Sequence, residues 1–142
     1  MCKPKVEIIE HTADLAILIS AKDYYELFSC APSVLYSIIG HIEINECTNP
    51  QEETISLQAG NKEELFHDWL TEILYYFEVR QLIFEECLFS VLKAERLESH
   101  IKSRKIDIHK SKIITEIKAV TYHDLKIEEK DGNIQARVIF DV

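Results

Sequence analysis

Apolar residues recur with helical spacing in two segments of the chain. The first segment begins after Asp23 and keeps its apolar positions on one side as far as Gly40, and the second begins after Asn61. Each start carries a capping signature, because the Asp or Asn is followed three residues later by Glu26 or Glu64. The pattern predicts two amphipathic helices, and each of them needs an apolar surface to cover.

Pro32 lies inside the first predicted helix. It has no N–H to donate to the carbonyl of Phe28, so we expect either a kink or a shorter first helix. A Glu-Leu-Phe triplet stands at equivalent places in the two helices, at residues 26–28 and 64–66. This short repeat suggests a duplicated structural unit.

Elsewhere the apolar positions alternate with polar ones, which is the period of a half-buried strand. The segment 82–93 alternates less regularly than the others, so we expect a bulge or bend in it. Asp131-Gly132 supplies the positive φ angles of a tight hairpin turn. The predicted strands are residues 6–11, 14–21, 53–59, 82–93, 113–120, 122–128 and 134–140.

The order of the predicted elements defines the fold class. Two strands, a helix, a strand, a helix and a run of strands do not alternate as in a doubly wound parallel sheet. We therefore predict an α+β two-layer sandwich, with two helices packed on a mainly antiparallel sheet, in a single domain over residues 1–142. The polar segment 41–52, which contains Asn49-Pro50, is predicted to be the flexible connection between the halves.

Composition places the chain among globular proteins, with 46% hydrophobic residues and only three Gly and three Pro. Its apolar runs are far too short to span a bilayer, and the acids near the start disrupt any signal-peptide core. We expect a cytoplasmic protein. Four cysteines, Cys2, Cys30, Cys47 and Cys87, have no metal-binding or redox spacing. Their even count would allow a set of disulfides, but without a secretory signal we expect free thiols, mostly buried.

The net charge of the chain bears on whether it binds nucleic acid or protein. Sixteen Lys and Arg against twenty-five Asp and Glu give a net charge of −9, which repels a phosphate backbone. Direct nucleic-acid binding is therefore not expected. A solvated loop is the simpler interpretation of one basic cluster, and an RNA or partner contact is the alternative. The cluster consists of Lys102, Arg104, Lys105, Lys110 and Lys112.

The common enzyme signatures are absent from the sequence: it has no Gly-rich phosphate loop, metalloprotease His pair, nucleophile elbow or EF-hand loop. With three glycines in the chain, a backbone cradle for a nucleotide is hard to build. The pattern argues against a nucleotide hydrolase.

Two acidic positions are candidates for chemistry. Asp14, with His11, flanks the break between two predicted strands, although hydrogen bonding of the turn by Thr12 and Asp14 is the simpler interpretation. Asp141 ends an apolar strand beside Val142, whose α-carboxylate would stand next to it. Neighbouring anions need a counter-charge, either a hard cation with oxygen ligands or a basic residue such as Lys118, unless the segment is simply solvated.

A third candidate is the segment 118–123. Lys118 lies in a predicted strand of apolar residues, so we expect it near a sheet edge or facing a carboxylate, with Thr121 on the opposite face. His123 is a candidate acid–base group or ligand, and a solvated strand end is the simpler alternative. An enzyme hypothesis makes Lys118 and His123 the acid–base pair of a small hydrolase or phosphotransferase.

Four motifs together resemble the archease family. They are His-Thr-Ala-Asp-Leu at 11–15, a Trp-Leu helix at 67–74, Lys-Ala-Val-Thr-Tyr-His at 118–123 and Phe-Asp-Val at 140–142. They occur in the family's order over almost the whole chain, and the last two are highly specific. One departure is the stretch 103–109, which is shorter than in the family and lacks its Gly-Glu pair.

The resemblance implies an α+β fold with a duplicated strand–helix–strand–strand unit. It implies a divalent cation, calcium in relatives, with magnesium and manganese as alternatives. The implied metal ligands are Asp14, Asp141 and Val142, and the implied auxiliary residues around them are His11, Lys118, Thr121 and His123.

The resemblance also implies a function. Members of the family are accessory proteins rather than enzymes, and they activate RtcB-type RNA ligases in tRNA splicing and RNA repair. They promote guanylylation of the ligase's histidine and allow repeated turnover. The alternative we retain is a chaperone or modulator of a tRNA-modifying enzyme, which an acidic chain suits because it would bind protein rather than RNA.

Overall fold

The computed structural model describes residues 2–10 and 14–142, and its two helices begin as the sequence predicts. In α1 (Tyr24–Ile39) the Asp23 carboxylate accepts from the N–H of Glu26 at 2.8 Å. In α2 (Lys62–Glu78) the Asn61 side chain accepts from the N–H of Glu64 at 2.9 Å. Each Glu in turn accepts from the N–H of the residue before the cap, which completes the same reciprocal cap on both helices.

Pro32 does not shorten α1, which continues through it to Ile39. The carbonyl of Phe28, which would accept from residue 32 in a regular helix, accepts instead from the indole Nε1–H of Trp69 at 2.9 Å. Trp69 lies on α2 and is fully buried. The second helix therefore supplies the hydrogen bond that the proline removes, and the expectation of a shorter helix was wrong.

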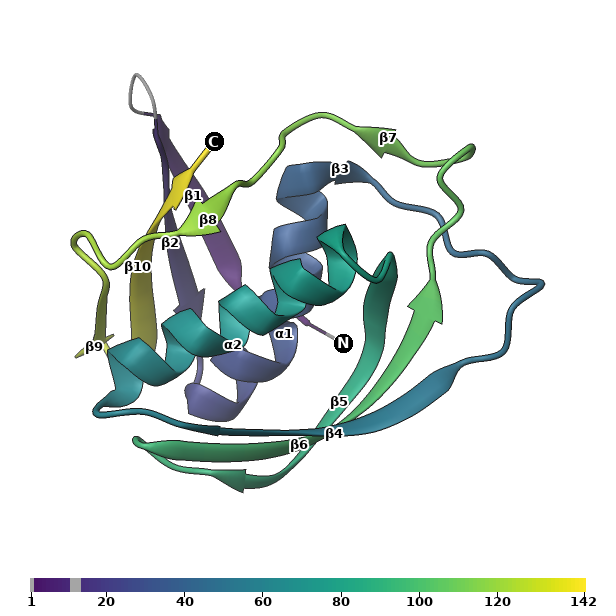
Figure 1. Ribbon diagram of the computed structural model, residues 1–142. Coiled ribbons are helices and arrows are strands. Elements are labelled where there is room, and N and C mark those ends of the chain that lie inside the picture. Colours follow the sequence, from purple (N-terminus) through teal and green to yellow (C-terminus); the bar gives the residue numbers. More distant parts are fainter. Residues whose placement is uncertain (1, 11–13) are drawn as a thin grey trace.

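Two antiparallel sheets enclose the helix pair (Figure 1). The larger consists of β1 (Lys5–Glu10), β2 (Asp14–Ala21), β10 (Asn133–Asp141), β8 (Ala119–Val120) and β9 (Lys126–Lys130). Its order is β1-β2-β10, and β8 and β9 both pair with β10. The smaller has the order β4-β6-β5 and consists of β4 (Gln51–Gln58), β6 (Arg96–Lys105) and β5 (Leu82–Leu92).

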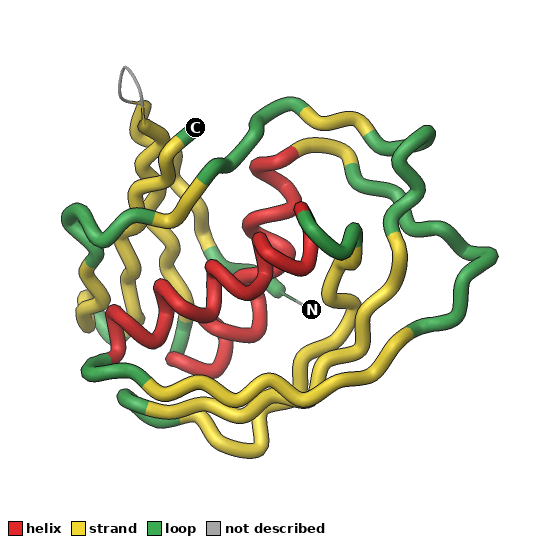
Figure 2. The backbone as a smooth tube through the Cα atoms, viewed as in Figure 1, coloured by secondary structure: helices red, strands yellow, loops and turns green. Residues whose placement is uncertain are grey.

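The helices lie between these sheets (Figure 2). The buried apolar residues of both helices belong to one core cluster with those of the strands. Trp69 packs against Phe84 and Phe89 of β5, and Phe28 of α1 packs against Phe66 of α2. The predicted α+β class, with two helices on mainly antiparallel strands, is confirmed. The strands form two sheets on either side of the helices rather than the single sheet of the predicted two-layer sandwich. Each helix contacts both of them, α1 through β2 and β5 and α2 through β8 and β5.

The predicted duplication has a definite form. In the first unit, β2 and α1 are completed by the hairpin β9–β10, with strand order β2-β10-β9. In the second, β4 and α2 are completed by the hairpin β5–β6, with the corresponding order β4-β6-β5. The second unit is inserted into the first between α1 and β9. Insertion explains why the two ends of the sequence meet in one sheet.

The sequence analysis missed β6, the central strand of the smaller sheet. Its inward positions are Leu97, Ser99, Ile101 and Ser103, all at most 1% exposed. Two of them are serines, so the alternation of apolar and polar residues is hidden. The basic cluster was consequently misassigned to a loop, because Lys102, Arg104 and Lys105 belong to β6 and Lys112 belongs to β7 (Lys112–Ile113).

The predicted strand 113–120 was also wrong, since only its two ends pair, as β7 and β8. The carbonyl of Ile39 at the end of α1 accepts from the N–H groups of both Ile114 and Thr115, which turns the chain away from a strand path. The predicted strand 122–128 begins only at Lys126. The hairpin turn and the bulges in β5 are confirmed, with φ of 53° and 80° at Asp131 and Gly132.

The connection 41–52 is not a free linker. It starts in β3 (Gly40–His41), which pairs with β7, and Ile44 forms a bridge with Ile106. The carbonyl of Glu43 accepts from the N–H of Asp107 at 2.7 Å, and the N–H of Asn45 donates to the carbonyl of Lys105 at 2.8 Å. Polar side chains misled the prediction because the pairing uses the backbone.

Two of the four cysteines predicted to be free thiols form a disulfide. Cys2 and Cys30 are bonded, with their Cα atoms 5.5 Å apart. Cys47 and Cys87 are free, and Cys47 is exposed rather than buried. The prediction failed because sequence spacing gives no indication that the segment before β1 passes α1. Neither helix in the described part of the chain is long and apolar enough to cross a membrane.

Candidate functional site

Asp14 and Asp141, the two carboxylates singled out from the sequence, are direct cross-strand partners. Asp14 opens β2 and Asp141 closes β10. Residues opposite one another in antiparallel strands project to the same face, with Cβ atoms about 5 Å apart. Asp14 is half-buried and Asp141 is exposed, so the two side chains leave paired positions on one face and both reach the surface.

Lys118 and Thr121 belong to the segment that runs along the other side of β10. The N–H of Lys118 donates to the carbonyl of Asp141 at 2.8 Å. Thr121 donates to the carbonyl of Ile139 twice, from its N–H at 3.0 Å and from its Oγ1 at 2.9 Å. Three of the predicted site residues are thus neighbours: Asp14 on β2, Asp141 on β10, and Lys118 in the segment that leads into β8.

The other predicted residues are placed differently. His123 is largely exposed, and its Nε2 lies 3.4 Å from the carboxylate of Asp124, so the structure does not bring it to the facing carboxylates. Val142 follows Asp141 and is 37% exposed. His11 lies outside the described residues.

The charges at the facing pair are of one sign. Within the described ranges, no Lys, Arg or His forms an ion pair with Asp14 or Asp141, and Lys118 is exposed. Those ranges also hold no cluster of three or more His, Cys, Asp or Glu side chains arranged to bind a metal ion. The site therefore rests on two carboxylates and the main-chain oxygens beside them. Such an all-oxygen set suits a hard cation rather than zinc or copper.

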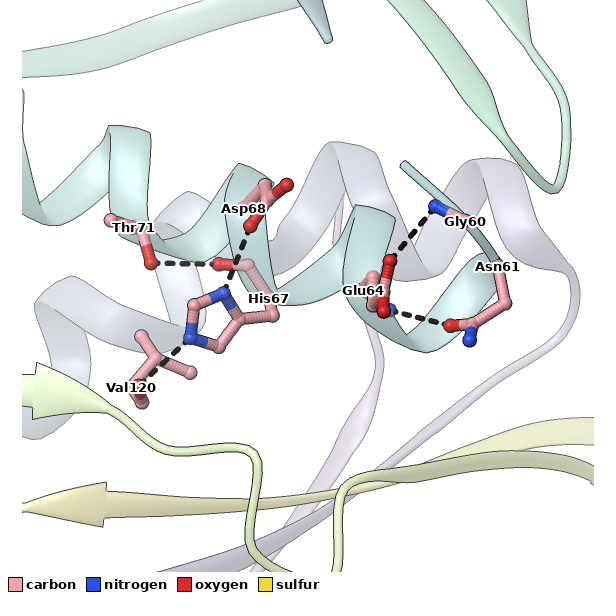
Figure 3. Close-up of polar contacts among 7 residues, drawn as sticks. All are labelled: Gly60, Asn61, Glu64, His67, Asp68, Thr71 and Val120. Carbon is pink, nitrogen blue, oxygen red and sulfur yellow. Dashed lines mark hydrogen bonds and ion pairs between the residues drawn. The ribbon is translucent and has the colours of Figure 1, made fainter. Parts of the chain in front are cut away.

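His67 of α2 is a residue of this region that the sequence analysis missed (Figure 3). Its Nε2 lies 2.9 Å from the carbonyl oxygen of Val120, and its Nδ1 lies 3.0 Å from the carboxylate of Asp68. The ring of Tyr122 stacks on it with 3.8 Å between centroids and 15° between planes. His67 thus joins two of the archease-like motifs, the Trp-Leu helix and the segment 118–123.

Periodicity gave no signal for His67. It lies between buried Phe66 and Trp69 on α2 and its side chain is 13% exposed, so it reads as a residue at the border of the apolar face. The one available clue was that its helix and its partner segment both belong to motifs. Sequence alone does not show that these motifs touch.

The fold and the paired acids define an α+β protein with a duplicated strand–helix–strand–strand unit and an acidic pair where β2 begins and β10 ends. Comparison with known proteins identifies the family that shares this fold. The model of the Archease protein family (MTH1598/TM1083) matches residues 7–142. This chain belongs to the archease family.

Its relatives cover nearly its full length. Protein archease of Methanosarcina mazei is 32% identical, over 97% of this chain and 96% of that protein. Protein archease of Methanopyrus kandleri is 34% identical, over 96% of this chain and 98% of that protein.

Two solved structures share the fold. One is the solution structure of protein 1598 of Methanobacterium thermoautotrophicum, with a TM-score of 0.72 and 25% identity over 96% of this chain and 98% of that one. The other is the crystal structure of an archease from Thermotoga maritima described as a possible chaperone. Its TM-score is 0.68, with 30% identity over 94% of each chain.

Proposed function

We propose that this protein is a metal-dependent accessory protein that activates an RtcB-type RNA ligase and has no turnover of its own. The observation that carries the proposal is the cross-strand pairing of Asp14 with Asp141. Membership of the archease family supplies the candidate partner, and the geometry of the pair supplies the candidate means.

The facing carboxylates favour a cation. Like charges directly opposite in a sheet repel each other. A divalent ion bound between them would neutralise this repulsion and offer open coordination positions to further oxygen ligands. Calcium takes six to eight oxygen ligands, and Asp14, Asp141 and a main-chain oxygen of Val142 fill only part of that number. Magnesium and manganese accept the same donors.

Incomplete coordination suits an activator. An accessory protein accelerates a partner's reaction by binding the reactive state of that partner more tightly than its resting state. An exposed site with free positions can take oxygens from the ligase or from its nucleotide. Lys118, exposed beside Asp141, adds a positive charge that attracts a phosphate or a partner carboxylate. Promotion of ligase guanylylation, and hence of repeated turnover, is the expected outcome.

The acid–base hypothesis for Lys118 and His123 has weaker support. His123 contacts Asp124, and it is largely exposed to solvent. General acid–base pairs act through groups held within hydrogen-bond reach of a common reactant. Turnover of a phosphate or ester substrate by the isolated protein, lost on His123→Ala, would favour the enzyme instead.

The chaperone alternative keeps one supporting observation, because the Thermotoga maritima relative is described as a possible chaperone. Co-purification distinguishes the two accessory functions. Recovery of an RNA ligase supports the activator, and recovery of a tRNA-modifying enzyme such as a methyltransferase supports the chaperone.

The decisive experiment is a guanylylation time course of the cognate ligase with and without this protein. We expect stimulation by the wild type and a loss of at least about tenfold with Asp14→Asn or Asp141→Asn, as expected when a metal site is weakened. Asp131→Asn is the matched control, because Asp131 lies in the turn at the opposite end of β10 and loses the same charge. Full stimulation by both site variants would contradict the metal-centred proposal.

A further inference from the structure

The side of β10 away from β2 is covered by an interrupted strand. β8 pairs Val120 with Phe140, and β9 pairs Lys126 with Arg137. Between these two pairs, residues 121–125 lie opposite only residues 138 and 139 of β10. The segment therefore has three more residues than the strand that it follows, and it forms a loop. β8 itself has two residues, which is too short to be stable by its own pairing.

Helix α2 takes the place of a further strand along this edge. Glu63 and His67 lie four positions apart, so their side chains lie on one face of the helix. The carboxylate of Glu63 accepts from the N–H of Ile127 at 3.0 Å, and His67 contacts the carbonyl of Val120 at 2.9 Å. Each side chain thus pairs one backbone group of an otherwise open edge, Glu63 on β9 and His67 on β8.

His67 contacts Val120, Asp68 and Tyr122, and Figure 3 shows the contacts with Val120 and Asp68. Because the carbonyl of Val120 can only accept, Nε2 must carry the proton in that hydrogen bond. The Asp68 carboxylate lies 3.0 Å from the opposite nitrogen and accepts from it when Nδ1 carries a proton as well, and the Tyr122 ring lies flat against the face of the imidazole. Asp68 and Tyr122 therefore orient His67 toward Val120.

The residues on both sides of Val120 bind the end of β10 that carries Asp141. Val120 is followed by Thr121, whose N–H and Oγ1 both donate to the carbonyl of Ile139. It is preceded by Ala119, the register partner of Asp141, and by Lys118, whose N–H donates to the carbonyl of Asp141. We infer that His67 is a positioning residue of the site: it sets the place of residues 118–121 against Asp141, and so links the inserted unit to the site in the first unit.

This inference deepens the proposed function, because the site that His67 positions is the proposed cation and ligase site. The experiment compares His67→Ala, His67→Gln and Glu63→Ala in the full chain. Glu63→Ala is the matched control, since it removes the equivalent contact from the same helix face to β9 rather than to β8. Amide hydrogen exchange and calcium affinity by calorimetry are measured for each variant.

For His67→Ala we expect faster exchange of the Lys118 and Thr121 amides and calcium binding weakened about tenfold, the lower end of losses seen when a ligand's supporting contact is removed. His67→Gln should restore most of both, because its amide N–H can donate to the Val120 carbonyl. Glu63→Ala should speed exchange at Ile127 and leave calcium affinity within about twofold.

Three results would overturn the inference. They are wild-type exchange at Lys118 and Thr121 in His67→Ala, calcium affinity unchanged in His67→Ala, and equal weakening of calcium binding by Glu63→Ala, which would mean general destabilisation. The proposed function fails separately, if the wild type binds no calcium. Amide exchange then still decides whether His67 positions residues 118–121. Wild-type exchange at Lys118 in His67→Ala would show that it does not.

Discussion

Asp14 and Asp141 stand directly opposite each other on β2 and β10, although almost the whole chain separates them in sequence. The pairing follows from the fold, because the second strand–helix–strand–strand unit is inserted into the first and returns the chain to β2. Two carboxylates directly opposite each other on one face of a sheet repel each other. That repulsion is the physical basis of the proposed cation site.

The first prediction concerns stability with and without calcium. In a chelator, Asp14→Asn should be as stable as the wild type or more stable by about 0.2–1 kcal/mol, because it removes a like-charge cross-strand pair. In saturating calcium the order should reverse, since binding at 100 times Kd adds about 2.7 kcal/mol to the wild type. Thermal unfolding in both buffers measures this. A variant that is equally destabilised in both would show that Asp14 has a structural role only.

The second prediction concerns Pro32 and Trp69. Trp69→Phe leaves the Phe28 carbonyl without its donor, which should cost about 1–3 kcal/mol of unfolding free energy beyond the lost packing. In a Pro32→Ala background the new N–H can donate to that carbonyl. The loss should therefore shrink by about 1 kcal/mol in a double-mutant cycle measured by denaturant unfolding. Strict additivity of the two substitutions would refute the compensation.

The third prediction concerns the four cysteines. Burial, and to a lesser degree the Glu86 carboxylate, raises the pKa of the Cys87 thiol to about 12, so at pH 8 it stays protonated and unreactive. Cys47 is exposed, whereas Cys2 and Cys30 are paired. Alkylation of the native protein without reductant, read by mass spectrometry, should therefore label Cys47 rapidly and Cys87 slowly, and should leave Cys2 and Cys30 unlabelled. Labelling of Cys30 without reductant would contradict the disulfide.

The elements with local signals could be predicted. Both helices were evident from their caps at Asp23 and Asn61, and the β9–β10 hairpin from Asp131-Gly132, because these features depend on neighbours in sequence. The strand β6 was not evident, since Ser99 and Ser103 are polar residues in inward positions. The course of residues 114–118 depends on a carbonyl at the end of α1, which no local pattern reveals.

The residues of the candidate site also differ in whether the sequence marked them. Asp14 and Asp141 were marked by their positions at strand ends and by the family motifs, yet only the sheet register shows that they face each other. His67 had no signal of its own, because its role arises from a contact with Val120 that is remote in sequence. The disulfide between Cys2 and Cys30 was missed for the same reason.

The most direct test of the central claim is a calorimetric calcium titration of the wild type, Asp14→Asn, Asp141→Asn and the control Asp131→Asn. We predict one saturable site in the wild type and in Asp131→Asn, and affinity reduced by at least about tenfold in each of the other two. Equal calcium affinity in all four proteins, or no saturable binding in the wild type, would contradict the account.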